Sequence, residues 1–308
     1  MKKVLVATDK PFATVAVDGI RKVVEQAGYE LALLEKYTEV SQLKEAAATA
    51  DAMIIRSDIA SREIIESAPN LKIVVRAGAG YDNIDLKACT EKGVVAMNTP
   101  GQNSNAVAEL AFGLILYCIR GTFSGASGTE LRGKKIGIHA YGNVGRYVAL
   151  VAKGFGMTVF AHDPFVKKED IEKDGVFAID TVEELYTKCQ YVSLNIPAND
   201  KTKKSINYDL VKLLPKNGML VNTARKEVID EEDLMKLMEE RADIRYVSDV
   251  APDNRIAFEE KFPGRVVFTA KKMGAQTAEA NINAGIAAAK QIVAFFENGD
   301  KTFQVNQG

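Results

Sequence analysis

The chain has 308 residues, with 40 basic and 41 acidic side chains and a formal net charge of −1 at pH 7. This length accommodates about two domains, and the balanced charge provides no basic footprint for nucleic acid. The apolar stretch from Ala106 to Ile119 contains Glu109 and is too short to span a bilayer. Met1-Lys2-Lys3 leads directly into an apolar run without the features of a signal peptide. These properties predict a cytoplasmic protein that binds neither nucleic acid nor membrane.

The first hundred residues alternate between short apolar runs and helical patterns, which is typical of a parallel sheet wrapped by helices. The five predicted strands are Lys3–Ala7, Leu31–Leu34, Ala52–Ile55, Lys72–Arg76 and Val94–Met97. The helical patterns between them are Val15–Glu25, Gln42–Ala50, Glu63–Ser67 and Leu86–Glu91. A long apolar helix is then predicted from Ser104 to Arg120.

A loop of small residues, GTFSGASG from Gly121, separates this part from a second alternating series. The predicted strands of that series are Lys135–His139, Thr158–His162, Tyr191–Ile196, Met219–Asn222, Tyr246–Val250 and Val266–Thr269. The last segment, Ala278–Phe296, has apolar residues at helical spacing and is expected to pack back on the first part. The sequence therefore predicts an α/β fold with two doubly wound parallel-sheet domains.

The stretch from Lys134 to Asp163 has the strand–turn–helix–strand pattern of a dinucleotide-binding unit. Its turn lets the backbone approach a pyrophosphate at the helix amino terminus, through Tyr141, Gly142, Asn143, Val144 and Gly145. Asp163 follows Gly145 by 18 residues and is placed to bind the adenosine ribose. Its charge disfavours a 2′-phosphate, so the predicted cofactor is NAD. Ala140 replaces the first glycine, and its methyl group fits if the backbone φ there is negative.

Two further loops follow predicted strands, at the edge where open α/β sheets bind ligands. In the first, Arg76 precedes Ala77, Gly78 and Ala79, whose N–H groups are candidates for binding a carboxylate or phosphate. The alternative is a tight turn into a helix capped by Asn83 or Asp85. In the second, Thr223 and Ala224 precede Arg225, which either acts on an anion or is a solvated charge.

Five segments, in this order, resemble the D-isomer-specific 2-hydroxyacid dehydrogenase family: Arg76–Asp85, Asn98–Leu116, the fingerprint with Asp163, Asn222–Arg225 and Ser248–Val250. The resemblance covers nearly the whole chain and is greatest to the phosphoglycerate dehydrogenases, in a short form without their regulatory C-terminal domain. It implies a Rossmann NAD-binding domain, residues 101–278, inserted into a flavodoxin-like substrate domain, residues 1–100 and 279–308, with a cleft between them. It also implies a homodimer built on the NAD-binding domain, near the helix 104–120.

The same resemblance implies NAD-dependent oxidation of D-3-phosphoglycerate to 3-phosphohydroxypyruvate, the first step of serine biosynthesis. Arg225 is implied to hold the substrate carboxylate, and Asp249 to contact the nicotinamide carboxamide. The substrate is expected to contact Arg56, Arg76, Ala77, Gly78 and Ala79. Further cofactor contacts are expected at Pro197, Thr202, Thr223 and Ala224.

The family's catalytic histidine has no counterpart here, because His139 and His162 both belong to strands of the nucleotide-binding unit. Alignment of the later glycine and threonine places Lys272 in the histidine position, while Asn254, beside Asp253, occupies the position of the partner glutamate. A lysine base needs its pKa lowered from about 10.4 to roughly 7–8, and the charge of Arg225 acts in that direction. We therefore predict that Lys272 accepts the proton, with Arg225 and Asp253 as the other catalytic residues. A direct contact between Asp253 and Lys272 would oppose the pKa shift.

Two alternatives stay open. The first is another 2-hydroxyacid dehydrogenase, acting on glyoxylate or hydroxypyruvate. If Arg56 and Arg76 both converge on the substrate tail, a substrate with a phosphate is favoured; if one of them faces solvent, these smaller acids are favoured. The second is an NAD(H)-sensing protein without catalysis, which the missing histidine favours and the retained Arg225 and Asp249 disfavour. No metal is expected, since the cysteines lack ligand spacing and read as reduced buried thiols: Cys89, Cys118 and Cys189.

Overall fold

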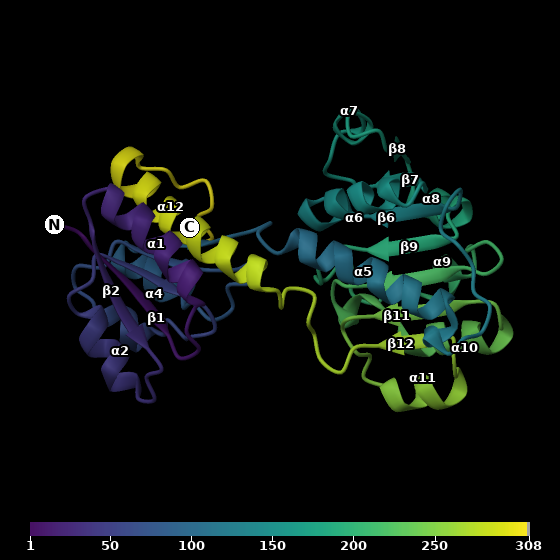
Figure 1. The fold of residues 1–308 in the computed structure, drawn as a ribbon, viewed down its shortest axis with the longest axis horizontal. Helices are drawn as coiled ribbons and strands as arrows, with labels where there is room; N and C mark the ends of the chain where they lie inside the picture. The colour runs from purple at the N-terminus through teal and green to yellow at the C-terminus, as the bar shows by residue number, and fades with distance from the viewer. Residues whose placement is uncertain (307–308) are drawn as a thin grey trace. The chain divides into compact units, whose positions relative to one another are not determined.

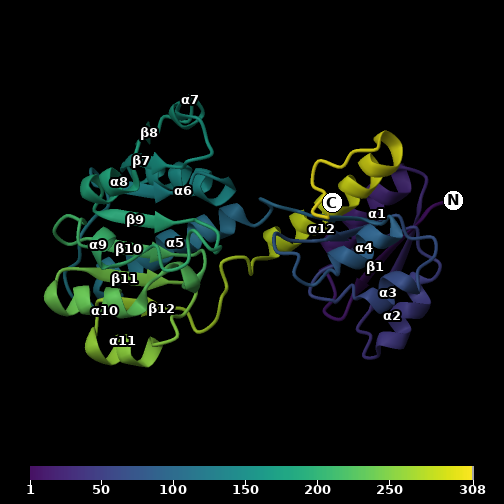
Figure 2. The ribbon, with the colours of Figure 1, turned by 180° about the vertical axis from the view of Figure 1, so that it is seen from behind.

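The computed structural model describes residues 1–306, and the chain divides into two units. The first unit combines Met1–Asn103 with the segment from Gln276 onward, and the second is Ser104–Ala275. Each unit contains one parallel sheet with helices on both faces (Figures 1 and 2). Among the described residues, no helix has the length and apolar character needed to cross a membrane.

The first unit contains a five-stranded sheet with the order β2-β1-β3-β4-β5, as many strands as predicted. All neighbouring strands are parallel: β1 (Lys3–Thr8), β2 (Glu30–Glu35), β3 (Ala52–Ile55), β4 (Ile73–Arg76) and β5 (Val95–Asn98). The helices of this unit are α1 (Thr14–Gln26), α2 (Val40–Ala47), α3 (Arg62–Glu66), α4 (Leu86–Lys92) and α12 (Ala278–Asn298). The inner strands are buried on both faces, which explains their continuous apolar runs.

The final helix, α12, packs against α1, as the sequence predicted for it. A Cβ at Gly19 of α1 would lie 2.6 Å from the side chain of Ile286, so the glycine permits this close approach. Thr277 caps α12 by accepting the N–H of Ala280 at 3.1 Å. The helix ends at Gly299, which has a φ of 68°.

The second unit contains a seven-stranded sheet with the order β12-β11-β10-β9-β6-β7-β8. Its strands are all parallel: β6 (Lys135–His139), β7 (Thr158–His162), β8 (Phe177–Ala178), β9 (Tyr191–Leu194), β10 (Met219–Asn222), β11 (Arg245–Ser248) and β12 (Val266–Phe268). Only β8 was not predicted, because a two-residue strand shows no periodicity. The predicted fold class is confirmed.

Helices cover both faces of this second sheet (Figures 1 and 2). They are α5 (Ser104–Ile119), α6 (Asn143–Gly154), α7 (Lys168–Glu172), α8 (Val182–Lys188), α9 (Tyr208–Val211), α10 (Glu231–Glu240) and α11 (Arg255–Lys261), with short 3-10 turns at Gly121–Phe123 and Lys226–Val228. The predicted apolar helix is α5, which packs beside α6 over one buried cluster of the sheet.

Candidate active site

The predicted cofactor residues of the second unit lie in loops that follow its strands. The loop after β6 holds Tyr141–Gly145, and Asp163 directly follows β7. The loops after β9, β10, β11 and β12 carry Pro197, Thr223–Arg225, Asp249 and Lys272. Since parallel strands end at one edge of their sheet, these residues gather at the carboxyl edge, where doubly wound folds bind ligands.

The turn after β6 keeps the backbone of a glycine-rich loop although its first residue is alanine. Ala140 has a φ of +77°, so the condition of a negative φ, under which its methyl group would fit without strain, is not met. A non-glycine residue in this region costs about 1–2 kcal/mol. At Gly145 a Cβ would lie 2.4 Å from the Ala140 carbonyl oxygen, whereas at Gly142 it would meet nothing within 4 Å. The turn is therefore tight at Gly145 and open at Gly142, where α6 presents its N-terminus.

Asp163 is held in place by the backbone. One carboxylate oxygen accepts the N–H of Tyr141 at 2.7 Å, and the other accepts the N–H of Phe165 at 2.8 Å. Each oxygen keeps lone-pair capacity for a ribose hydroxyl. The carboxylate thus lies beside the phosphate turn, as a dinucleotide site requires, and its charge disfavours the 2′-phosphate of NADP.

The remaining predicted cofactor residues leave polar atoms without partners. Thr202 donates its hydroxyl to the carbonyl of Pro197 at 2.6 Å, which closes the loop after β9. The side-chain oxygen of Asn195, at the start of this loop, and the hydroxyl of Thr223, in the loop after β10, are buried and have no hydrogen-bond partner among the described residues. Buried polar atoms are rarely left unpaired in proteins. Together with the turn and Asp163, these atoms fit an NAD molecule.

Two cations converge on one carbonyl oxygen after β10. The buried Asn222 shapes this loop: its side chain accepts the N–H of Ala224 and donates to the carbonyl of Arg225, both at 3.0 Å. An Arg225 guanidinium nitrogen then donates to the Ala224 carbonyl at 2.9 Å, and Lys272 Nζ lies 3.5 Å from the same oxygen. The sequence separates these two cations by almost fifty residues, and the fold brings them together as predicted.

The surroundings of Lys272 lower its pKa. The residue as a whole is exposed, but partial burial of its ammonium group is the largest cause, followed by the charge of Arg225. Asp249 and Glu227 act in the opposite direction and do not cancel the shift. A lower pKa increases the fraction of neutral amine, which is the form that accepts a proton.

Asp249 anchors the segment that carries Lys272. This carboxylate is only 1% exposed. Its two oxygens accept the N–H groups of Met273 and Gly274, each at 2.8 Å, and the hydroxyl of Thr269 donates to it at 3.1 Å. A Cβ at Gly274 would lie 2.9 Å from the carboxylate, so the glycine permits this approach. The sequence did not indicate this anchoring, and the nicotinamide contact stays a prediction for Asp249.

The structure does not bring Asp253 to Lys272. Its carboxylate is 74% exposed and pairs with Lys226 at 2.5 Å. Glu231, which the sequence did not single out, accepts the backbone N–H groups of Asp253 and Asn254 at 2.8 and 2.9 Å. The contact that would raise the pKa of Lys272 is therefore not made, and a catalytic role of Asp253 stays a prediction without support from this geometry.

Both histidines lie within the second sheet. Burial, with a smaller contribution from His162, lowers the pKa of His139 to about 4. Its Nδ1 lies 3.5 Å from the hydroxyl of Tyr186, and Nδ1 of His162 lies 3.0 Å from the carbonyl of Ile179. His139 is neutral and packed at neutral pH, which agrees with the prediction that it is a strand residue.

In the first unit, Arg76 lies across the loop that follows β4. Its Nε donates to the carbonyl of Arg56 at 3.2 Å. A Cβ at Gly78, where φ is +150°, would lie 1.4 Å from a guanidinium nitrogen of Arg76, so only glycine leaves room for it. Burial and the charge of Arg56 lower the pKa of Arg76, against the opposing charge of Asp82. Within residues 1–306, no carboxylate lies within 4.0 Å of this guanidinium.

Arg56 is tied to its own unit more firmly than Arg76. Its guanidinium donates to the carbonyls of Lys10 and Pro11 at 3.2 and 3.3 Å, and to the side-chain oxygen of Asn281 at 2.8 Å. It also lies over the ring of Phe12 at 5.0 Å. These contacts occupy donors of Arg56 that were expected to bind the substrate.

The first two small residues after Arg76 use their N–H groups within the turn. The N–H groups of Ala77 and Gly78 donate to the carbonyls of Ile55 and Arg76 at 2.8 and 2.9 Å. They are therefore not available to an anion in this conformation, contrary to expectation. The alternative reading of a capped turn is confirmed, since Asp85 accepts the N–H of Ala88 at 2.8 Å at the start of α4.

Comparisons with known proteins agree with this geometry. Residues 118–270 match the family model described as D-isomer specific 2-hydroxyacid dehydrogenase, NAD binding domain. The chain is 34% identical over 293 residues to a D-3-phosphoglycerate dehydrogenase of Methanocaldococcus jannaschii, covering 88% of this chain and 54% of the relative. It is 31% identical over 283 residues to a glyoxylate reductase of Thermococcus litoralis, covering 85% of this chain and 82% of the relative. The chain thus spans about half the length of the former relative.

Solved structures match nearly the whole chain. The NAD+-bound 3-phosphoglycerate dehydrogenase of Entamoeba histolytica is 47% identical, with a TM-score of 0.82 and 99% of both chains covered. A D-2-hydroxyisocaproate dehydrogenase gives a TM-score of 0.81 at 19% identity, covering 99% of this chain and 100% of the other. The second match supports the fold alone.

Proposed function

Because the chain belongs to the D-isomer-specific 2-hydroxyacid dehydrogenase family and binds NAD, we propose that it oxidises D-3-phosphoglycerate to 3-phosphohydroxypyruvate, as a step of serine biosynthesis. The observation that carries the proposal is the convergence of Arg225 and Lys272 on the Ala224 carbonyl. A guanidinium and an amine with a lowered pKa provide an anion-binding group and a proton acceptor side by side.

Each residue has a defined role in the proposed reaction. Arg225 binds the substrate carboxylate and polarises the C2 oxygen through its planar set of donors. Neutral Lys272 Nζ takes the proton of the C2 hydroxyl as the C2–O bond becomes a carbonyl. Bound NAD+ supplies the acceptor for the C2 hydride and is reduced to NADH. The oxidation therefore yields the keto acid, NADH and one proton, which rests on Lys272.

The substrate phosphate is assigned to Arg76 in preference to Arg56. Within the part of the chain that the structure describes, the guanidinium of Arg76 has one hydrogen bond, to the backbone of Arg56, whereas that of Arg56 is held by Lys10, Pro11 and Asn281. A guanidinium with free donors binds a phosphate through two parallel hydrogen bonds. Arg56 then supports Arg76 through its carbonyl oxygen.

A substrate series tests the reaction. NADH formation is measured from about pH 7 to 10 with D-3-phosphoglycerate, D-glycerate and D-lactate. We expect the greatest kcat/KM with D-3-phosphoglycerate and a rate that climbs with pH, because the lysine must lose its proton. If none of the acids reduces NAD+ while the protein still binds NADH, the result would support the sensor alternative and contradict the proposal.

Reduction of glyoxylate or hydroxypyruvate is the second candidate function. It is favoured by the engagement of Arg56 with its own unit and by relatives named glyoxylate reductase and hydroxypyruvate reductase. The assay runs in the reverse direction, with NADH and each keto acid. A kcat/KM for glyoxylate or hydroxypyruvate above that for 3-phosphohydroxypyruvate would replace the first proposal by this one.

We further propose that the chain forms a homodimer through its NAD-binding unit. Several apolar side chains on and just after α5 and α6 are exposed: Tyr117, Phe123, Tyr147 and Leu150. Exposed apolar patches of this kind mark interaction surfaces. Light scattering after size-exclusion chromatography should give twice the mass of one chain, and a monomeric Leu150→Arg variant would locate the interface on α6.

A further inference from the structure

A polar pocket lies in the NAD-binding unit, at the edge of the sheet opposite the cofactor loops. It has a volume of about 280 Å³, far more than the roughly 15 Å³ that a single water needs. Four adjacent strands contribute to it at or just before their first residues: Lys134 before β6, Gln190 and Tyr191 at β9, Asn217 before β10 and Arg245 at β11. The loop 127–129 after α5 forms another wall.

The charged groups lining this pocket are both cations. Lys134 Nζ donates to the hydroxyl of Thr129 at 2.6 Å, and no acidic residue is among the lining side chains. Arg245 makes no ion pair within residues 1–306, and its Nε is buried without a hydrogen-bond partner. Within the described residues, no carboxylate therefore compensates the charge of the Arg245 guanidinium.

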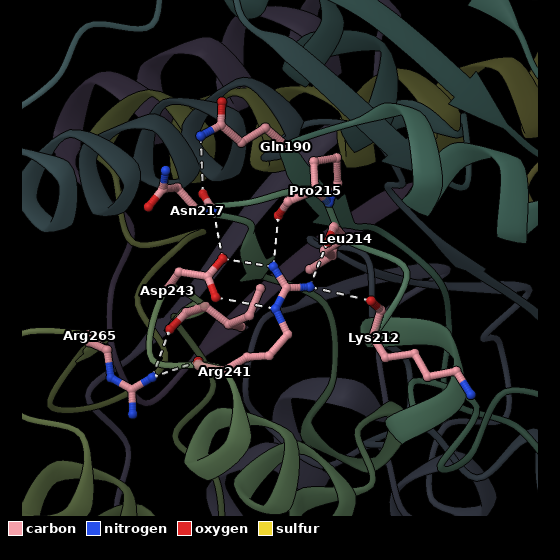
Figure 3. A network of polar contacts seen from close by, with 9 residues as sticks. Gln190, Lys212, Leu214, Pro215, Asn217, Arg241, Asp243 and Arg265 are labelled. Carbon is pink, nitrogen blue, oxygen red and sulfur yellow. Dashed lines mark hydrogen bonds and ion pairs between the residues drawn. The ribbon is translucent and has the colours of Figure 1, made fainter.

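The neighbouring network strengthens the positive charge at this edge. Asp243 accepts the N–H of Asn217 at 2.7 Å and pairs with Arg241 at 2.7 Å, so its charge is already compensated (Figure 3). Arg265 donates to the carbonyl of Arg241 (Figure 3) and to the carbonyl of Met238, not to a carboxylate. The network thus has two arginines, Arg241 and Arg265, and a single carboxylate, Asp243.

The neutral residues of the pocket provide hydrogen-bond groups suited to an anion. Burial raises the pKa of Tyr191, so its hydroxyl stays protonated and can donate. Gln190 is oriented by donating to the Asn217 carbonyl at 3.1 Å (Figure 3). The wall formed by Ser127 and Thr129 adds two hydroxyl groups. A Cβ added at Gly128 would lie 2.5 Å from the carbonyl oxygen of Ile119, so this wall packs tightly on the end of α5.

We propose that this pocket binds a small oxyanion, free phosphate or the phosphate group of a small ester, between Arg245 and Lys134. Arg245 supplies the paired donors that match a phosphate, and Lys134 supplies a second charge. Strands β9, β10 and β11 run from this pocket to the loops that hold Pro197, Thr223 and Asp249. The proposal does not rest on the substrate assigned above.

The test measures binding of inorganic phosphate by isothermal titration calorimetry, with chloride at matched ionic strength as the reference. The protein is saturated with NADH so that the cofactor turn is filled. We expect Arg245→Met to lose at least about tenfold in affinity at one site per chain. Arg21→Met, which alters an exposed pair on α1, should leave the isotherm unchanged. The proposed substrate arginine, Arg76, is intact in both variants, so its contribution is the same.

Two further measurements keep the result decisive. Lys134→Met should also weaken phosphate binding, so the proposal can be tested even if Arg245→Met folds poorly. Glycerol 2-phosphate in place of phosphate separates the two sources: tighter binding of the ester identifies an organic phosphate as the ligand, and weaker binding identifies the free ion. Identical phosphate isotherms for the parent, Arg245→Met and Lys134→Met would overturn the proposal.

Discussion

The carboxylate of Asp249 accepts the backbone N–H of Gly274 at 2.8 Å, and so fixes the segment in which Lys272 projects toward Arg225. A buried acid therefore positions the proposed base through the backbone. The same acid raises the pKa of Lys272, although burial and Arg225 outweigh it. Position and charge can be separated by substitution.

Asp249→Asn should lower kcat by about tenfold or more, because an amide cannot accept both the Met273 and Gly274 N–H groups. The removal of a negative charge should also move the rising limb of the pH–rate profile to lower pH. Glu227→Gln is the matched control: it removes the other negative charge near Lys272 and leaves the Asp249 contacts intact. We expect the same direction of pH shift there, with kcat near that of the parent. A parent-like kcat in Asp249→Asn would contradict the positioning role.

Lys272→Ala should reduce turnover by about 10²–10⁴-fold, the usual contribution of a general base. NADH affinity, measured by fluorescence, should stay close to that of the parent. In the parent, kcat/KM should rise with pH through the lysine pKa, which lies below its ordinary value, and this limb should be absent in the variant. Lys271 is exposed and adjacent in sequence, so Lys271→Ala is the control for the loss of one positive charge. Near-normal turnover of Lys272→Ala would refute the assignment.

Ala140→Gly should raise the free energy of unfolding by up to about 1 kcal/mol. Glycine relieves the strain of a φ of +77°, although part of the gain is lost to the greater freedom of the unfolded chain. Chemical denaturation with urea measures the difference. Gly145→Ala should act in the opposite direction and weaken NADH binding, because its Cβ would meet the Ala140 carbonyl oxygen at 2.4 Å. An unchanged affinity in Gly145→Ala would contradict this account of the turn.

Asp163→Ser should weaken NADH binding and narrow its advantage over NADPH. The carboxylate is held by the N–H groups of Tyr141 and Phe165, and its charge repels a 2′-phosphate. Removal of that charge should lower the ratio of the two affinities by about tenfold. Titration of tyrosine fluorescence with both cofactors gives the ratio, and a ratio equal to that of the parent would assign cofactor choice to other residues.

Arg76→Met should raise the KM for D-3-phosphoglycerate by about 10–100-fold, the loss expected for a charge-assisted hydrogen-bonded pair. The KM for D-glycerate, which lacks the phosphate, should stay unchanged. Arg56→Met should instead lower the melting temperature, since Arg56 is bonded to Lys10, Pro11 and Asn281. An equal rise of both KM values in Arg76→Met would mean that Arg76 does not read the phosphate.

The amino-acid sequence by itself determined the cofactor, the order of the strands apart from β8, and the helices α1 to α6 and α12; it did not single out α7 to α11. Strands such as Ala52–Ile55 and Met219–Asn222 are buried on both faces, so their apolar runs are visible without any long-range information. The signature from the phosphate turn to Asp163 is also local, because one strand–turn–helix–strand unit contains all of its parts. Periodicity could not reveal β8, which has two residues.

The tertiary structure decided everything that depends on partners distant in sequence. In the fold, Asp253 forms an ion pair with Lys226 rather than with Lys272, and Asp249 accepts a hydrogen bond from the backbone N–H of Gly274. The fold also gave Ala140 a φ of +77°, which the sequence pattern did not indicate. Hydrogen bonds and ion pairs form across strands and loops that chain spacing does not encode. Sequence can therefore nominate Lys272, and only the folded sheet edge sets its contact with Ala224 and its charge environment.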